Sequence, residues 1–296
     1  HGLFQNCKSL ESIIIPNNVT SIGDQALYNC TSLSSIRIGS NIKSWGKQIF
    51  YGCSGTLYID SNIISLPEKD GAFYGSKFLS LTLGPHVTEI GSYAFYGTGL
   101  RSIEIEGNIT SIGLSAFENC SDLQSFKFPG SLTSIGNKAF KNCHALYSVD
   151  IPEIIGTIGE ETFYGCKNLS AISIKNISSI GDYAFANCSN LTTVELSDNI
   201  TMIGVNPFRN CVNITAFEGK YASTDGRCLI VNNKLIACIT KGLTEYTLPN
   251  GIRETGAYVL IGTDLKSLTI PDDVIYIRNY SFYGSELVRV DIGDNV

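Results

Sequence analysis

A bulky apolar residue recurs along the chain at intervals of 22 or 23 positions, with a single longer interval of 52. We call this series the aromatic column; its members are Phe4, Leu27, Phe50, Phe73, Phe95, Phe117, Phe140, Phe163, Phe185, Phe208, Leu260 and Phe282. Two positions after each member the chain has only Asn or Gly, the residues that best tolerate a left-handed backbone. The pattern therefore predicts a single helical turn around each aromatic residue, which ends at the Asn or Gly.

Two further patterns complete each repeat. Four positions before the aromatic residue, Gly occurs in nine of the eleven visible cases, which predicts a second turn with positive φ or a close approach of two backbone segments. After the Asn or Gly comes Leu-x-x-Ile-x-Ile or a near variant, as at residues 33–38, 100–105 and 191–196. The alternation of β-branched residues at the end of this motif predicts a strand.

A unit of 22 or 23 residues cannot bury its own apolar side, so the units must stack. We therefore predict an α/β solenoid of about twelve coils, in which the strands form a parallel sheet on the concave face and each coil has one helical turn. Residues 1–296 would form this single domain. The pattern begins and stops within a repeat, so we expect a segment cut from a longer protein. Residues 55–70 lack the strand rhythm and the Ile-Gly pair, which predicts a distorted coil.

The complete motif is Ile-Gly-x-x-Ala-Phe-x-x-Cys-x-x-Leu-x-x-Ile-x-Ile-Pro, with its first half well represented at residues 180–188. This motif resembles the BspA-like subclass of leucine-rich repeats, and the resemblance extends over the whole chain. It implies a leucine-rich-repeat solenoid, an extracellular or cell-surface location, and attachment to host matrix proteins, host cells or other microbes.

The long interval of the aromatic column indicates an insertion over residues 215–245. Within it, residues 226–238 have the pattern of two strands around an Asn-Asn turn at Asn232 and Asn233. This segment looks like the β-hairpin insertion that BspA-like proteins often carry. We place it as a side excursion that decorates one coil, and a dedicated binding protrusion is the alternative.

Eight of the ten cysteines lie three positions after the aromatic residue: Cys7, Cys30, Cys53, Cys120, Cys143, Cys166, Cys188 and Cys211. Neighbouring coils are close enough for disulfides. The other coils, however, have Ser or Thr at this position, which favours reduced, buried thiols that pack as small hydrophobes. Cys228 and Cys238 flank the hairpin and could pair across it in one register, although a one-residue slip separates them.

Composition narrows the function. The chain has 21 Lys and Arg against 27 Asp and Glu, a net charge of −6, which argues against nucleic acid as a partner. No apolar run approaches the length of a membrane span, so we expect no membrane insertion. The three His lie in different coils, no Cys-x-x-Cys pair occurs and no phosphate-binding motif is present. We therefore expect no enzyme, no cofactor and no metal.

The strand alternation predicts which side chains face outward. With Ile36 and Ile38 directed inward, Ser35 and Arg37 point out from the sheet. The Ser35 position is mostly a small hydroxyl residue in the other coils. The second outward column contains Ile14, Arg37, Thr82, Glu104, Lys127, Asp150, Ser173, Glu195, Glu218, Thr269 and Asp291, and it is acidic from Asp150 to Glu218.

We take the charged members of this column as candidate partner-binding residues: Arg37, Glu104, Lys127, Asp150, Glu195, Glu218 and Asp291. The alternative is a merely solvated sheet face. The corresponding function is a non-enzymatic cell-surface or secreted adhesion module with an extracellular protein or glycan ligand. A structural spacer that displays another domain and binds nothing itself is the competing hypothesis.

Overall fold

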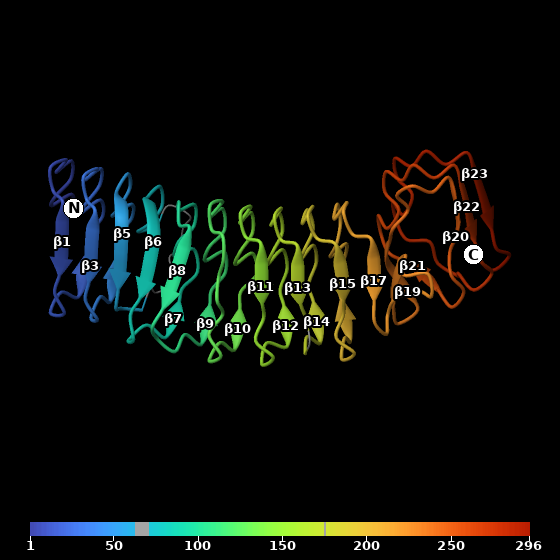
Figure 1. Ribbon diagram of the computed structural model, residues 1–296, viewed down its shortest axis with the longest axis horizontal. Helices are drawn as coiled ribbons and strands as arrows, with labels where there is room; N and C mark the ends of the chain where they lie inside the picture. The colour runs from blue at the N-terminus through green and yellow to red at the C-terminus, as the bar shows by residue number, and fades with distance from the viewer. Residues whose placement is uncertain (63–70, 175) are drawn as a thin grey trace.

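The computed structural model describes residues 1–62, 71–174 and 176–296. Its coils lie next to one another along the long axis of the molecule, with the two termini near opposite ends (Figure 1). Neighbouring coils are joined by parallel strand pairs in a regular register. The predicted solenoid of parallel strands is therefore confirmed.

The strands of the Leu-x-x-Ile-x-Ile motif form what we call the main sheet. Its first part has the order β1-β3-β5-β6-β8, and later strands pair as β11-β13, β15-β17 and β20-β22-β23. Equivalent residues of successive repeats pair directly, for example Ile13 with Ile36 and Ile36 with Leu57. The strands are β1 (Ser12–Ile15), β3 (Ser35–Ile38), β5 (Ser54–Ile59), β6 (Lys77–Leu83), β8 (Ser102–Ile105), β11 (Ser148–Asp150), β13 (Ala171–Ser173), β15 (Thr193–Glu195), β17 (Ala216–Glu218), β20 (Glu245–Thr247), β22 (Ser267–Ile270) and β23 (Arg289–Ile292).

Two-residue strands that precede the recurring glycine position pair in parallel in three groups, which together we call the second sheet. They are β2 (Ser21–Ile22), β4 (Ser44–Trp45), β7 (Glu89–Ile90), β9 (Ser111–Ile112), β10 (Ser134–Ile135), β12 (Thr157–Ile158), β14 (Ser179–Ile180) and β16 (Met202–Ile203). The glycines that follow them have no positive φ, but a Cβ on Gly136 would lie 2.6 Å from the backbone carbon of Gly113. Of the two roles predicted for this glycine column, close backbone approach is the correct one.

The predicted helical turn is wrong, because the described residues contain no helix. Each aromatic residue lies instead in an irregular segment of turns, here called the turn segment. The Asn or Gly two positions after it is left-handed in all twelve repeats, as predicted. A second left-handed residue lies two positions before the aromatic-column residue, as at Gln25 (φ 55°), which precedes Leu27.

These two left-handed residues send backbone N–H groups sideways to the next coil. In the second repeat the donors Gln25, Leu27 and Asn29 bond in order to the carbonyl oxygens of Lys47, Ile49 and Tyr51, at 2.9, 3.0 and 2.7 Å. A helix would direct the same groups along its own axis to the residue four positions earlier. The hydrogen bonds between coils replace those within a helix.

The core is a column of aromatic rings. From Phe50 to Phe208 the rings of the aromatic column follow one another with centroids between 5.0 and 5.7 Å apart. All ten cysteines are free thiols. The eight that lie three positions after an aromatic-column residue, here called the cysteine column, are buried except Cys7. The reduced, buried interpretation is therefore confirmed, with Cys7 as its exception.

Each buried thiol of this column also donates a hydrogen bond that the sequence does not reveal. Its Sγ lies 3.0–3.2 Å from the carbonyl oxygen of the aromatic-column residue one coil earlier. Cys143, for example, donates to the carbonyl of Phe117. The thiols thus connect coils as well as filling space.

The coil expected to be distorted is more regular than predicted. β5 lies in register with both neighbours, pairing Leu57 with Ile36 and with Leu81. A register shift between Gly55 and Thr56 is its local irregularity. The remainder of that expectation concerns residues 63–70, which lie outside the described residues.

The insertion contains an antiparallel hairpin of β18 (Cys228–Val231) and β19 (Lys234–Cys238). Its turn residues Asn232 and Asn233 both have positive φ, as a two-residue type I′ turn requires. A bulge between Leu229 and Ile230 absorbs the one-residue slip, so Cys228 and Cys238 pair across the hairpin. Their Sγ atoms lie 3.0 Å apart as two free thiols.

The hairpin is part of the stack and not a side excursion, because β19 pairs in parallel with β21 (Glu254–Thr255). The main sheet is interrupted at this place: β17 ends one group of strands and β20 begins another. In Figure 1, β19 and β21 lie between β17 and β20. β19 divides two cores, since Ile236 packs in the first hydrophobic cluster and Leu235 in the second.

Candidate interaction surfaces

The register of the main sheet arranges the second outward column as a row of neighbouring side chains. Arg37 pairs with Tyr58, Tyr58 with Thr82, and Thr82 with Glu104. Parallel strands lie about 4.8 Å apart, so each residue of the row lies directly beside the next. We call the solvent side of this sheet the sheet face.

The predicted candidate residues all lie on the sheet face but do not converge on one point. Arg37, Glu104, Lys127, Asp150, Glu195 and Glu218 are exposed, and Asp291 is half-buried. The structure brings Glu195 directly beside Glu218, whereas Arg37 and Asp291 lie near opposite ends of the molecule. Such a row suits an extended contact with a partner and does not suit chemistry at one atom.

Most charges of the sheet face are unpaired. Glu104, Lys127, Asp150, Glu195 and Glu218 form no ion pair with any other described residue. Asp291 differs, because its Oδ1 accepts a hydrogen bond of 2.9 Å from Arg289 Nε. From Asp150 onward, up to the break at the insertion, the face therefore presents carboxylates that form no ion pair with another described residue.

Tyr58 belongs to this row and was missed by the sequence reasoning. The Arg37 guanidinium lies 4.0 Å above its ring, and its hydroxyl donates to Glu106 Oε2 at 3.3 Å. Desolvation, followed by the negative charges of Asp60 and Glu106, raises the pKa of Tyr58, so the phenol remains a neutral donor. Alignment of Thr56-Leu57-Tyr58-Ile59 with the strand motif of the previous repeat would have identified it.

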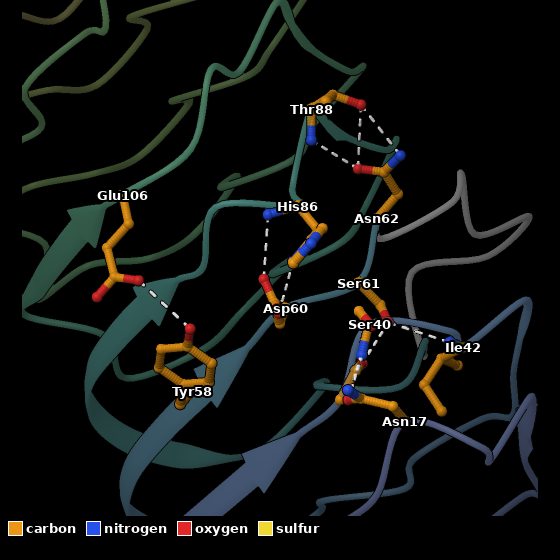
Figure 2. Close-up of polar contacts among 11 residues, drawn as sticks. Asn17, Ser40, Ile42, Tyr58, Asp60, Ser61, Asn62, His86, Thr88 and Glu106 are labelled. Atoms are coloured by element: carbon orange, nitrogen blue, oxygen red, sulfur yellow. Dashed lines mark hydrogen bonds and ion pairs between the residues drawn. The ribbon is translucent and has the colours of Figure 1, made fainter.

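A polar cluster lies where the strands of this region turn into the next corner (Figure 2). Asp60 accepts hydrogen bonds from the backbone N–H of His86 at 3.1 Å and from His86 Nδ1 at 2.8 Å. Asn62 Oδ1 accepts from the backbone N–H of Thr88 at 2.7 Å. The Ser61 hydroxyl joins two more groups, donating to the carbonyl of Gly39 and accepting from the N–H of Ile42.

The hydrogen bonds of this cluster connect the corner of one coil to the corner of the next. The same type of bond, from a backbone N–H to a side-chain oxygen of the previous coil, occurs where Asn17 accepts from the N–H of Ser40 and where Asp272 accepts from the N–H of Asp294, both at 3.1 Å. The recurrence indicates a structural role for the hydrogen bond between Asp60 and the His86 N–H. Within the described residues no group of three His, Cys, Asp or Glu side chains could hold a metal ion.

A second surface feature is a row of half-buried and exposed tyrosines on the edge formed by the turn segments. Tyr28, Tyr51, Tyr74 and Tyr96 follow the aromatic column by one position in four successive repeats, and we call them the tyrosine row. The rings of Tyr28 and Tyr51 stack with centroids 4.8 Å apart. Those of Tyr74 and Tyr96 are 6.4 Å apart. The repetition was visible in the sequence but was not used.

No helix among the described residues has the length and apolar character needed to cross a membrane. The family model of the BspA type leucine rich repeat region matches the chain in six copies, over residues 1–124, 56–170, 110–224 and 230–296. A comparison with curated protein sequences finds no match.

Several solved structures resemble the chain. A leucine rich cell surface protein from Faecalibacterium prausnitzii is 24% identical with a TM-score of 0.70, over 81% of this chain and 70% of that protein. The pneumococcal vaccine antigen PcpA is 17% identical with a TM-score of 0.49, over 82% of this chain and 57% of its own. A leucine-rich repeat protein from Bacteroides ovatus is 19% identical with a TM-score of 0.35, over 92% and 82%. Of these three, the first supports a shared fold.

Proposed function

Because the chain belongs to the BspA-type leucine-rich repeat family, we propose that it is a non-enzymatic protein-binding or adhesion module of a cell-surface or secreted protein. Its partner is an extracellular or surface protein, or a glycan, bound on the sheet face through residues between Arg37 and Asp291. Host matrix proteins, host cells and other microbes are the classes of target that the family suggests. The similarity to a solved structure described as a cell surface protein agrees with this location.

The observation that carries the proposal is the direct pairing of Glu195 with Glu218 on the exposed sheet face. Like charges directly opposite one another on neighbouring strands destabilise a sheet. With Asp150 they form an exposed acidic segment that no described cation neutralises. A basic surface on a partner would neutralise it, which supports a positively charged protein region as the ligand of this half of the face.

The test begins with binding of the purified chain to an array of matrix proteins and glycans. For a confirmed ligand, the double variant Glu195→Lys and Glu218→Lys should weaken binding by at least about tenfold, because two attractive contacts become repulsive. The matched control reverses Glu89 and Glu153, which are exposed and lie outside the outward column. Loss of affinity in the control alone, or in neither variant, would place the ligand elsewhere, with the tyrosine row as the next surface to mutate.

The structural spacer remains the second candidate. A regular stack whose coils are fastened by repeated hydrogen bonds, as at Asn17 and Asp272, is suited to hold another domain at a distance. This alternative predicts that the chain binds no member of the array while retaining its folded structure. Binding of a ligand that the Glu195 and Glu218 reversal abolishes would exclude it.

A further inference from the structure

A cavity of about 410 Å³ lies where the insertion interrupts the stack. One wall is the turn segment that contains Phe208, and the opposite wall is the turn segment that contains Leu260, lined by its neighbours Val259 and Ile261. Residues 236–241 of the hairpin strand and the chain after it form the third side. The volume is in the range of ordinary ligand-binding pockets.

The backbone groups of the two walls have lost their partners. In eight other turn segments three alternate N–H groups donate to the next segment, as Asn187 does to the carbonyl of Arg209 at 2.7 Å, and the Leu260 segment donates two. At the cavity, the equivalent N–H groups of Asn206, Phe208 and Asn210 pair with no described residue. The equivalent carbonyl oxygens on the other wall, those of Ala257, Val259 and Ile261, likewise accept no hydrogen bond from the described chain.

Two side chains of the first wall are also unsatisfied. Asn206 is only 8% exposed, lines the cavity, and its Nδ2 has no hydrogen-bond partner among the described residues. The buried Nε of Arg209 also has no hydrogen-bond partner among the described residues. The Arg209 guanidinium lies 5.6 Å from the centre of the Tyr258 ring. Buried donors in native proteins are nearly always bonded, so this wall requires acceptor oxygens from outside the chain.

The path of the chain explains why the coil at the cavity has no turn segment. Leu235 and Tyr246 occupy the places of Ile22 and Ile36 in a regular coil but are eleven positions apart, where Ile22 and Ile36 are fourteen apart. The intervening segment also pairs with the hairpin, since the N–H of Ile239 donates to the carbonyl of Arg227 at 2.8 Å. This connection is three residues shorter than in a regular coil and is partly paired with the hairpin, so it forms no turn segment between those of Phe208 and Leu260.

We propose that this cavity binds a peptide segment of a partner protein that takes the place of the missing turn segment. Its carbonyl oxygens accept from Asn206, Phe208 and Asn210, and its N–H groups donate to the opposite wall. An aromatic side chain enters beside Phe208, where the ring column would continue. This is strand-addition recognition transferred to a turn segment, with the backbone giving affinity and the aromatic residue giving specificity. The site is separate from the sheet face and does not depend on the function proposed for it.

The positive charges at the cavity determine which residue should follow the aromatic one in the bound peptide. Arg209 directly follows Phe208, so a residue that follows the ligand's aromatic side chain lies beside the guanidinium, because equivalent positions stack along the solenoid. Lys241 adds a second cation at the cavity. Among the described residues that line the cavity, Asp264 is the one acid. The ligand therefore has an aromatic residue followed by an acidic one.

The turn segment at residues 113–119 supplies a suitable probe, since Gly-Leu-Ser-Ala-Phe-Glu-Asn contains an aromatic residue followed by Glu. The acetylated and amidated peptide of this sequence is titrated into the ¹⁵N-labelled full chain. We expect saturable binding with downfield shifts of the Asn206, Phe208 and Asn210 amide protons. The peptide with Ala in place of Phe should bind at least about tenfold more weakly.

Variants of the chain separate this site from others. Asn206→Asp exchanges a donor for an acceptor while keeping a residue that tolerates left-handed backbone, and it should weaken binding at least about fivefold. Gln25→Glu makes the same exchange at the equivalent position of an intact coil and should leave binding unchanged. Lys241→Glu, at an exposed position, should weaken the Glu peptide and favour the peptide with Lys in its place. Absence of saturable binding, shifts confined to other coils, or equal affinity for the Phe and Ala peptides would overturn the proposal.

Discussion

At the scale of single residues, cysteine suits this buried position better than the serine that replaces it in the coil of Phe73. The Cys120 thiol fits the interior and donates to the carbonyl of Phe95. Ser76 occupies the same column, and its buried hydroxyl has no hydrogen-bond partner among the described residues. Thr98 lies 3.2 Å from the Cys120 Sγ. A thiol tolerates burial because it is a weak donor with modest desolvation cost, and this explains the frequency of cysteine at the position.

The buried thiols predict a loss of stability in alkali. Burial raises the pKa of Cys120 to about 11 and that of Cys211 to about 12, from an ordinary value of 9.0. Between pH 9 and these values the unfolded chain releases thiol protons that the folded chain retains, so rising pH favours unfolding. Each such thiol lowers the free energy of unfolding by up to about 1.4 kcal/mol per pH unit in this interval.

Urea unfolding at pH 8 and at pH 10.5 measures this effect. The double variant Cys120→Ser and Cys211→Ser is the control, because it removes two of the titrating groups from a column that accepts Ser in another coil. The decline between the two pH values should be smaller in this variant than in the natural chain. Equal declines would show that other groups, such as tyrosines and lysines, determine the alkaline behaviour.

At the scale of elements, each coil is shaped by residues with unusual backbone demands. The position two after the aromatic residue is left-handed and is Asn or Gly throughout. The position two before it is also left-handed, yet it holds Lys138, Glu161 and Tyr183 in successive coils. Left-handed backbone costs such residues roughly 1–2 kcal/mol. The hydrogen bonds of their N–H groups to the next coil offset this cost.

Two glycine substitutions distinguish backbone strain at a positive φ from steric overlap between neighbouring coils. Gly97→Ala adds a Cβ that meets only the Tyr74 ring at 3.6 Å, so it should lower the free energy of unfolding by about 1 kcal/mol through its positive φ. Gly136→Ala adds a Cβ at 2.6 Å from the backbone of Gly113, which cannot move without separating two coils. It should cost about 3 kcal/mol. Denaturant midpoints of the two variants compare them, and equal losses would contradict the close-approach role of the glycine column.

At the scale of the whole molecule, the insertion divides a stack that is otherwise continuous. The first hydrophobic cluster extends from Ile22 to Ile236, and the second from Cys228 to Val274. In a solenoid each coil is stabilised mainly by its neighbours, so cooperativity is transmitted only where coils are in contact. The turn segments on the two sides of the break exchange no backbone hydrogen bond among those of the described chain.

We therefore predict two unfolding transitions on heating. The coils from β20 onward should unfold first, because their cluster contains far fewer buried residues. Leu268→Ala, in the second cluster, should lower the first transition, and Leu146→Ala, in the first cluster, should lower the second. Each truncation removes a fully buried leucine and costs about 2–5 kcal/mol. Calorimetry follows both transitions, and a single transition lowered by both variants would show that cooperativity crosses the break.

Prediction from the sequence succeeded where a residue type is compatible with only one backbone conformation. It failed where two different local structures require the same residue type. The left-handed Asn or Gly column was predicted correctly because only a few residue types tolerate that backbone. The helical turn was predicted wrongly because a left-handed stop after an aromatic residue suits both a helix end and a turn segment. For the candidate surface, the outward residues follow from strand alternation, whereas Tyr58 was missed because its coil departs from the repeat spacing.

The sequence by itself determined the repeat, the parallel strands, the buried aromatic and cysteine columns, and the outward-facing charges from Arg37 to Asp291. These features follow from periodicity, since each coil must bury the same positions against identical neighbours. Tertiary structure alone decided the direction of the turn-segment hydrogen bonds, the inclusion of the hairpin in the second sheet, and the cavity beside Phe208. These three features depend on which coil supplies the hydrogen-bond partner of each backbone N–H group. The repeat pattern does not specify that partner, and it does not show where the insertion removes it.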